Sequence, residues 1–132
     1  MPALAGIRSA DRSAVTTSRD GSIVVQAVAR HLRLWERDTR RLRFHADLPG
    51  SATAVAWSPA GSRVAVALDT GAVLLVGAAD GQPLARIEPR GATVSALAFT
   101  EDGTRLVAAG EDPVLRIYDV VTQEEVVALR GH

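Results

Sequence analysis

Histidine and carboxylate side chains are the groups in this sequence that could bind a metal or transfer protons. The chain holds three histidines, His31, His45 and His132, and no cysteine. No two histidines have the spacing His-x-His or His-x-x-x-His, and a structural zinc site needs about four converging ligands. We expect His31 to lie in a loop before a strand and His45 to follow a strand in solvent. The sequence therefore predicts no metal site.

Motifs for nucleophilic catalysis and phosphate binding are also missing. The sequence contains no Gly-x-Ser-x-Gly elbow, and without lysine it cannot form a Gly-x-x-x-x-Gly-Lys loop. Glu101 and Asp102, and Glu111 and Asp112, lack the alternating spacing of a calcium loop, so we interpret them as turn residues that cap backbone groups. The sequence predicts no catalytic residue, no cofactor and no enzyme activity.

The densest basic stretch is residues 37–43, which contains four arginines. Guanidinium groups suit phosphate oxygens, but charges also line solvated outer strands, where they deter edge pairing. We favour the second interpretation. The formal net charge of the 132 residues is zero, so bulk charge does not favour nucleic acid or a membrane surface as a partner. Arginine is in excess before residue 50 and acids after it, a difference that could draw two chains together. Lacking cysteine, a signal peptide and a membrane span, the sequence favours a cytoplasmic location.

The elements that would position these groups repeat along the chain. A turn ending in glycine recurs at Gly21, Gly61 and Gly103, spaced 40 and 42 residues apart. Glycine suits a tight hairpin turn because it adopts positive φ without a Cβ clash. Trp57 and Phe99 stand at equivalent positions before their turns, and we expect both to pack between units.

Each unit contains four short apolar runs rich in β-branched and small residues, as buried strands are. We predict strands over 14–17, 23–27, 32–35 and 41–44, over 54–57, 64–68, 73–76 and 83–87, and over 96–99, 106–109, 115–118 and 125–129. A four-stranded meander of about 40 residues has the period and strand count of a propeller blade.

The third unit, over 94–103, 106–110 and 112–119, resembles a repeat of the WD-repeat family. That family ends a repeat in Trp-Asp, and the pairs here are Trp35-Glu36, Val76-Gly77 and Tyr118-Asp119. Its opening Gly-His pair is clear only at Gly131-His132. No unit carries the family's full His, Ser or Thr, Trp and Asp network, although Asp112 and Trp35 match single positions. We therefore expect weaker polar cross-linking inside each unit than the family pattern gives.

The resemblance implies an all-β fold of three four-stranded antiparallel blades of a WD-type β-propeller. Residues 1–132 form a single segment, with blades near 9–46, 51–88 and 92–130, and 1–8 as a possible outer strand of another blade. Known propellers have roughly four to eight blades, so we expect that this chain alone does not close the ring. Ending just after Gly131-His132 favours a piece of a larger propeller.

By resemblance, the chain is a non-catalytic protein–protein interaction scaffold whose partners are a protein or peptide and further propeller blades. Two alternatives are a fragment that completes its ring with copies of itself, and the sensor region of a longer signalling chain. The resemblance implies that partners bind the loops between fourth and first strands and between second and third strands. The candidate residues there are Arg30, His31, Asp69, Thr70, Arg90, Glu111 and Asp112.

Overall fold

The computed structural model describes residues 13–18, 20–59, 63–88, 94–110 and 114–130, which form only strands, turns and connecting segments. No helix in these residues is long and apolar enough to span a membrane. Residues 1–8, predicted as a possible outer strand, lie outside the described part of the chain.

In the described part of the chain, twelve strands form three antiparallel sheets of four. Sheet 1 contains β1 (Ser13–Thr17), β2 (Ile23–Val28), β3 (His31–Glu36) and β4 (Arg41–Asp47). Sheet 2 contains β5 (Ala52–Trp57), β6 (Arg63–Leu68), β7 (Val73–Gly77) and β8 (Pro83–Ile87). Sheet 3 contains β9 (Val94–Phe99), β10 (Arg105–Gly110), β11 (Val114–Asp119) and β12 (Glu125–Arg130). The predicted fold class is confirmed: the three meanders form an arc of blades that does not close.

The turns behave as their glycines predict. Gly21 and Gly103 adopt φ of 76° and 74°, in the left-handed region that favours glycine. The third turn glycine, Gly61, lies outside the described residues. These turns fix the register of each hairpin, and the pleat turns alternate residues of each strand to opposite sides of its sheet.

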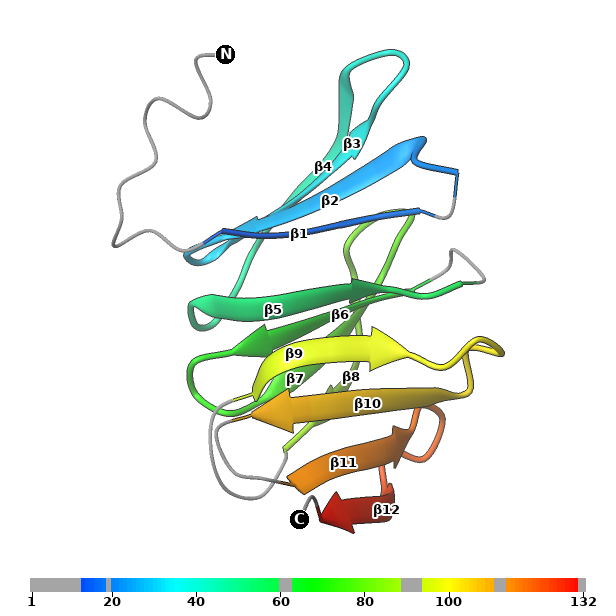
Figure 1. The fold of residues 1–132 in the computed structure, drawn as a ribbon. Helices are drawn as coiled ribbons and strands as arrows, with labels where there is room; N and C mark the ends of the chain where they lie inside the picture. Colours follow the sequence, from blue (N-terminus) through cyan, green and yellow to red (C-terminus); the bar gives the residue numbers. More distant parts are fainter. Residues whose placement is uncertain (1–12, 19, 60–62, 89–93, 111–113, 131–132) are drawn as a thin grey trace.

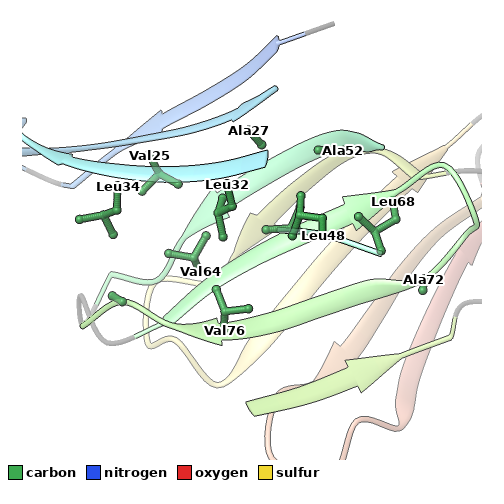
Figure 2. Close-up of a cluster of buried hydrophobic side chains, with 12 residues drawn as sticks. Val25, Ala27, Leu32, Leu34, Leu48, Ala52, Val64, Leu68, Ala72 and Val76 are labelled. Carbon is green, nitrogen blue, oxygen red and sulfur yellow. The ribbon is translucent and has the colours of Figure 1, made fainter. Parts of the chain in front are cut away.

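The sheets stack so that their first strands, β1, β5 and β9, lie side by side in that order (Figure 1). Between sheets 1 and 2, a cluster of buried aliphatic side chains fills the gap, with Val25 and Leu34 from one side and Val64 and Val76 from the other (Figure 2). All four are at most 3% exposed. Burying such side chains contributes roughly 1.5–3 kcal/mol each, so this contact holds sheet 1 to sheet 2.

A second cluster joins sheets 2 and 3 and includes Leu75, Ile87, Leu106 and Tyr118. Sheet 2 is thus covered on both faces, which explains the near-continuous apolar sequence of β6 and its burial from Val64 to Leu68. The prediction for the aromatic pair is confirmed: Trp57 packs against the first cluster and Phe99 against the second.

Candidate functional site

Three segments meet at one end of sheets 1 and 2: the β2–β3 turn, the connection 48–52 between the sheets, and the β6–β7 turn. The Leu48 amide donates to the Arg30 carbonyl at 2.7 Å, and the Ala52 amide donates to the Ala29 carbonyl at 2.7 Å. On the other side, the Asp69 amide donates to the Ser51 carbonyl at 2.8 Å. The connection is therefore fixed by backbone bonds to a turn of each sheet.

The predicted loop residues Asp69 and Thr70 lie against this connection. The Asp69 Oδ1 atom accepts a 3.2 Å hydrogen bond from the Ser51 amide. A Cβ atom added to Gly50 would stand 2.9 Å from Asp69 Oδ1 and 3.2 Å from Thr70 Cγ2, which explains glycine there. Both side chains are nevertheless exposed, so both present polar atoms to solvent while Asp69 also holds the connection.

Arg30 belongs to the same loop end, with its carbonyl used in the network and its side chain exposed. Arg90, Glu111 and Asp112 lie outside the described residues. The structure thus brings Arg30, Asp69 and Thr70 onto one rigidly held loop surface, whose cation, carboxylate and hydroxyl can form hydrogen bonds with a peptide.

The prediction that His31 and His45 lie outside strands is wrong, whereas the predicted exposure of His45 is confirmed. His31 is the first residue of β3, and His45 lies inside β4, which continues to Asp47. The β3–β4 pairing sets His31 opposite Asp47 and Arg33 opposite His45. The Nδ1 atom of His31 lies 3.3 Å from Asp47 Oδ1 and 3.2 Å from His45 Nε2. Sequence reasoning missed this cluster because it considered spacing along the chain and not across a hairpin.

The interpretation of the acidic residues as turn residues is confirmed at Asp102. Its carboxylate accepts hydrogen bonds from the Thr104 amide at 3.0 Å and the Thr100 hydroxyl at 2.7 Å. These bonds, the Thr104 amide first, lower the pKa of Asp102 to about 2. Asp20 makes the same turn in sheet 1, and the Ser22 amide and hydroxyl bonds lower its pKa to about 2.

The basic stretch 37–43 lies on and before β4, the edge strand of sheet 1. Arg43 pairs with Glu36 at 3.2 Å and Arg37 with Asp38 at 3.4 Å, and Arg41 is exposed. Hydrogen bonds from Thr39 and Arg43 lower the pKa of Glu36. The interpretation as a solvated outer strand is confirmed, since residues 37–43 are exposed at the edge of the sheet.

Residues 81–119 match the model of the family described as WD domain, G-beta repeat. The match runs from the turn before β8 to the end of β11, so it joins the last strand of sheet 2 to the first three strands of sheet 3. It ends at Asp119, in the pair that stands in place of the family's Trp-Asp.

Two other proteins are similar to a larger part of the chain. The chain is 29% identical over 114 residues to Topless-related protein 4 of Arabidopsis thaliana, covering 80% of this chain and 10% of that protein. It is also similar in structure to a chain of the hydrazine synthase of Kuenenia stuttgartiensis, with a TM-score of 0.81 and 18% identity. That superposition covers 89% of this chain and 35% of the other, and it shows the fold alone.

Proposed function

Because the chain belongs to the WD-repeat β-propeller family, we propose that it is a non-catalytic protein-interaction scaffold that forms part of a larger propeller. WD40 repeats generally mediate protein–protein interactions. The chain spans a small part of the similar proteins, 10% of one and 35% of the other, so the activities of those whole proteins are not transferred to it.

The observation that carries the proposal is the open face of sheet 3, defined as the side turned away from sheet 2. The strand registers assign to it eight apolar side chains, bordered at one end by the charged pair Arg105 and Asp119: Ala96, Ala98, Val107, Ala109, Leu115, Ile117, Val127 and Leu129. Leu115 and Leu129 are 42% and 50% exposed. A contiguous apolar face of this kind marks a surface that contacts another protein element.

The repeat shows which element fits there. The cross-strand pair Val107 and Ile117 is equivalent to Val25 and Leu34 in sheet 1 and to Ala65 and Leu75 in sheet 2. Those two earlier pairs pack against the following sheet and are at most 1% exposed. Sheet 3 therefore presents the surface that sheets 1 and 2 use to receive the next sheet, and a further blade is the occupant we propose.

For the protein or peptide partner, we propose the loop surface that includes Arg30, Asp69 and Thr70. It has exposed groups of both charges on a backbone that is fixed by hydrogen bonds, which limits the entropy lost on binding. His31, Arg90, Glu111 and Asp112 remain predictions for the same surface, and the cytoplasmic location remains a prediction as well.

The alternative is that copies of this chain complete the ring for one another. The open face of sheet 1, turned away from sheet 2, contains Val15, Trp35 and Leu42 among its polar residues, and these could receive the open face of sheet 3 from a second chain. Missing blades and self-completion both use the open face of sheet 3. Only self-completion also needs the open face of sheet 1, so substitutions on sheet 1 distinguish the two.

The test is the absolute mass of the purified chain, measured by size-exclusion chromatography with light scattering over a range of concentrations. The wild-type chain is compared with the double variant Val127→Glu/Leu129→Glu on sheet 3 and with Val15→Glu on sheet 1. If further blades are missing, we expect polydisperse association that the double variant reduces and Val15→Glu leaves unchanged.

A discrete oligomer that both variants disrupt would support self-completion in place of missing blades. A monodisperse, folded monomer of wild-type mass at every concentration would contradict both, because an apolar face of this extent would then need no cover. The double variant must keep the wild-type circular dichroism spectrum, which we expect since both positions are exposed.

A further inference from the structure

The β3–β4 hairpin brings three metal-binding side chains to one place on the open face of sheet 1. His31 pairs with Asp47, and His45 lies two residues before Asp47 on the same strand. Alternation turns these three side chains to one side of the sheet, while Leu32 and Leu34 turn to the buried side. Two imidazoles and one carboxylate therefore converge at the end of a hairpin whose other face is anchored in the core.

The donor atoms form a nearly equilateral triangle. His31 Nδ1 lies 3.2 Å from His45 Nε2 and 3.3 Å from Asp47 Oδ1, and His45 Nε2 lies 3.6 Å from Asp47 Oδ1. Zinc bonds to nitrogen and oxygen of about 2.0–2.1 Å, arranged as a tetrahedron, place two donors about 3.3–3.4 Å apart. The three side chains already have the spacing of one triangular face of such a tetrahedron.

Direct hydrogen bonds cannot form along all three sides of this triangle at once. An ionised carboxylate only accepts, and each ring nitrogen is either a donor or an acceptor. If both nitrogens donate to Asp47, neither nitrogen can accept a hydrogen bond from the other. If only one carries hydrogen, the lone pair of the other faces the carboxylate. In every tautomer, one side of the triangle therefore brings two donors or two acceptors together. A cation inside the triangle would instead face three lone pairs.

We propose that His31, His45 and Asp47 bind a divalent transition-metal ion of the Zn²⁺ type. Imidazole nitrogen with one carboxylate oxygen is a donor set suited to zinc, copper or nickel, whereas calcium and magnesium take oxygen ligands. The side chains are 47%, 41% and 82% exposed, so an ion can enter and its fourth position is open to water or another ligand. The site uses this chain's residues alone and does not depend on the proposed function.

The other sheets provide an internal comparison. In sheet 2, the positions equivalent to His31, His45 and Asp47 are Ala72, Arg86 and Glu88. There the arginine and glutamate pair directly at 2.6 Å. The same backbone therefore carries a simple ion pair in one blade and a trio of metal ligands in another, so the trio does not follow from the repeat itself.

The experiment is calorimetric titration of Zn²⁺ into the full 132-residue chain after treatment with EDTA and removal of the chelator. We expect one ion per chain, no competition from excess Mg²⁺ or Ca²⁺, and affinity at least about tenfold weaker in His31→Gln, His45→Gln and Asp47→Asn. The matched controls are His132→Gln, which removes the third histidine, and Asp38→Asn, which removes an exposed carboxylate of the same hairpin. Both should bind as the wild type does.

Two further measurements test the proposed metal site independently of calorimetry. Zn²⁺ should raise the melting temperature of the wild type and not that of His45→Gln, because an ion bound to the native state stabilises it. Co²⁺ should give the strong visible absorption of a four-coordinate site only when all three residues are present. Zn²⁺ binding that survives each of the three substitutions, that is lost in His132→Gln, or that leaves the melting temperature unchanged would overturn the proposal.

Discussion

The two ends of the stack have different surfaces although they are built from equivalent strands. The open face of sheet 3 is apolar on all four strands except for Arg105 and Asp119 at one end. That of sheet 1 mixes apolar residues with Gln26, Arg33 and the trio His31, His45 and Asp47. Since the backbones share one pattern, the difference lies in the side chains. The open face of sheet 3 has the composition of a buried interface. The open face of sheet 1 has the composition of a surface that is stable in contact with water.

The repeat allows the two end sheets to be compared at equivalent single positions. Gln26 is equivalent to Val66 in sheet 2 and Ala108 in sheet 3, and both of these are buried against the preceding sheet. Thr17 is equivalent to Trp57 and Phe99, which pack in the two clusters. Sheet 1 has thus exchanged packing residues for polar ones on the side where a preceding sheet would lie.

The largest expected effect compares equivalent residues on a covered and an open face. Leu75→Ala, at 1% exposure between sheets 2 and 3, should lower the free energy of unfolding by about 2–5 kcal/mol, because it leaves a cavity. Ile117→Ala occupies the equivalent position on the open face of sheet 3 and should cost only about 1 kcal/mol, since less area is removed from water. Urea denaturation at low protein concentration measures both.

This comparison fails if Ile117→Ala costs as much as Leu75→Ala at low concentration, because the open face of sheet 3 would then be covered within a single chain. If the cost of Ile117→Ala rises with protein concentration while that of Leu75→Ala does not, association covers the face.

The sequence predicts those parts of the fold that are determined by residues close together along the chain. Strand cores and turns are local, and the predicted runs 54–57 and 125–129 fall inside β5 and β12. Strand ends are set by the pairing partner. The predicted run 41–44 ends at Phe44, but β4 continues to Asp47 because β3 begins at His31 and offers backbone groups to pair with. The hydrophobic periodicity of one strand cannot show where that strand ends when its end depends on the partner strand.

The candidate sites divide in the same way. The loops that carry Arg30, Asp69 and Thr70 follow from the strand order, so sequence reasoning identified them. The hydrogen bonds from 48–52 that hold those loops together depend on how two sheets stack, which no local pattern encodes. The metal-ligand trio required the β3–β4 register, which a hairpin alignment of His31 against Asp47 would have supplied.

An intermediate effect is expected where sheet 2 holds the outer strand of sheet 1. Gly81, in the β7–β8 turn, has φ of 75°, and a Cβ there would stand 2.7 Å from the Phe44 ring. Gly81→Ala should therefore cost more than the about 1–2 kcal/mol of left-handed strain alone. Gly71→Ala is the matched control, because Gly71 has φ of 95° and nothing within 4 Å of an added Cβ. Equal losses in urea denaturation would show that Phe44 moves freely and that β4, with its histidine, is loosely held.

The smallest effect tests a feature that the two end sheets share and the middle sheet lacks. Asp20 and Asp102 occupy equivalent turns, whereas sheet 2 has Ala60 in the corresponding sequence. Hydrogen bonds lower the pKa of each carboxyl from 3.8 to about 2, so the charged form is favoured in the folded state. Their contribution to stability is present above pH 4 and is lost as the pH falls toward 2. Asp102→Asn should therefore melt slightly below the wild type at pH 7, and this difference should disappear near pH 2.

The same reasoning predicts how the two turns combine. Asp20 and Asp102 lie in sheets 1 and 3 and share no partner, so the loss in Asp20→Asn/Asp102→Asn should equal the sum of the single losses. Melting curves of the four proteins from pH 7 to pH 2 measure this directly. Additivity would show that the two turns act independently, and equal single losses would show that the first hairpins of the end sheets are built equally firmly. A loss confined to one turn, or one that persists at pH 2, would show that the ends also differ in how firmly their first hairpins are built.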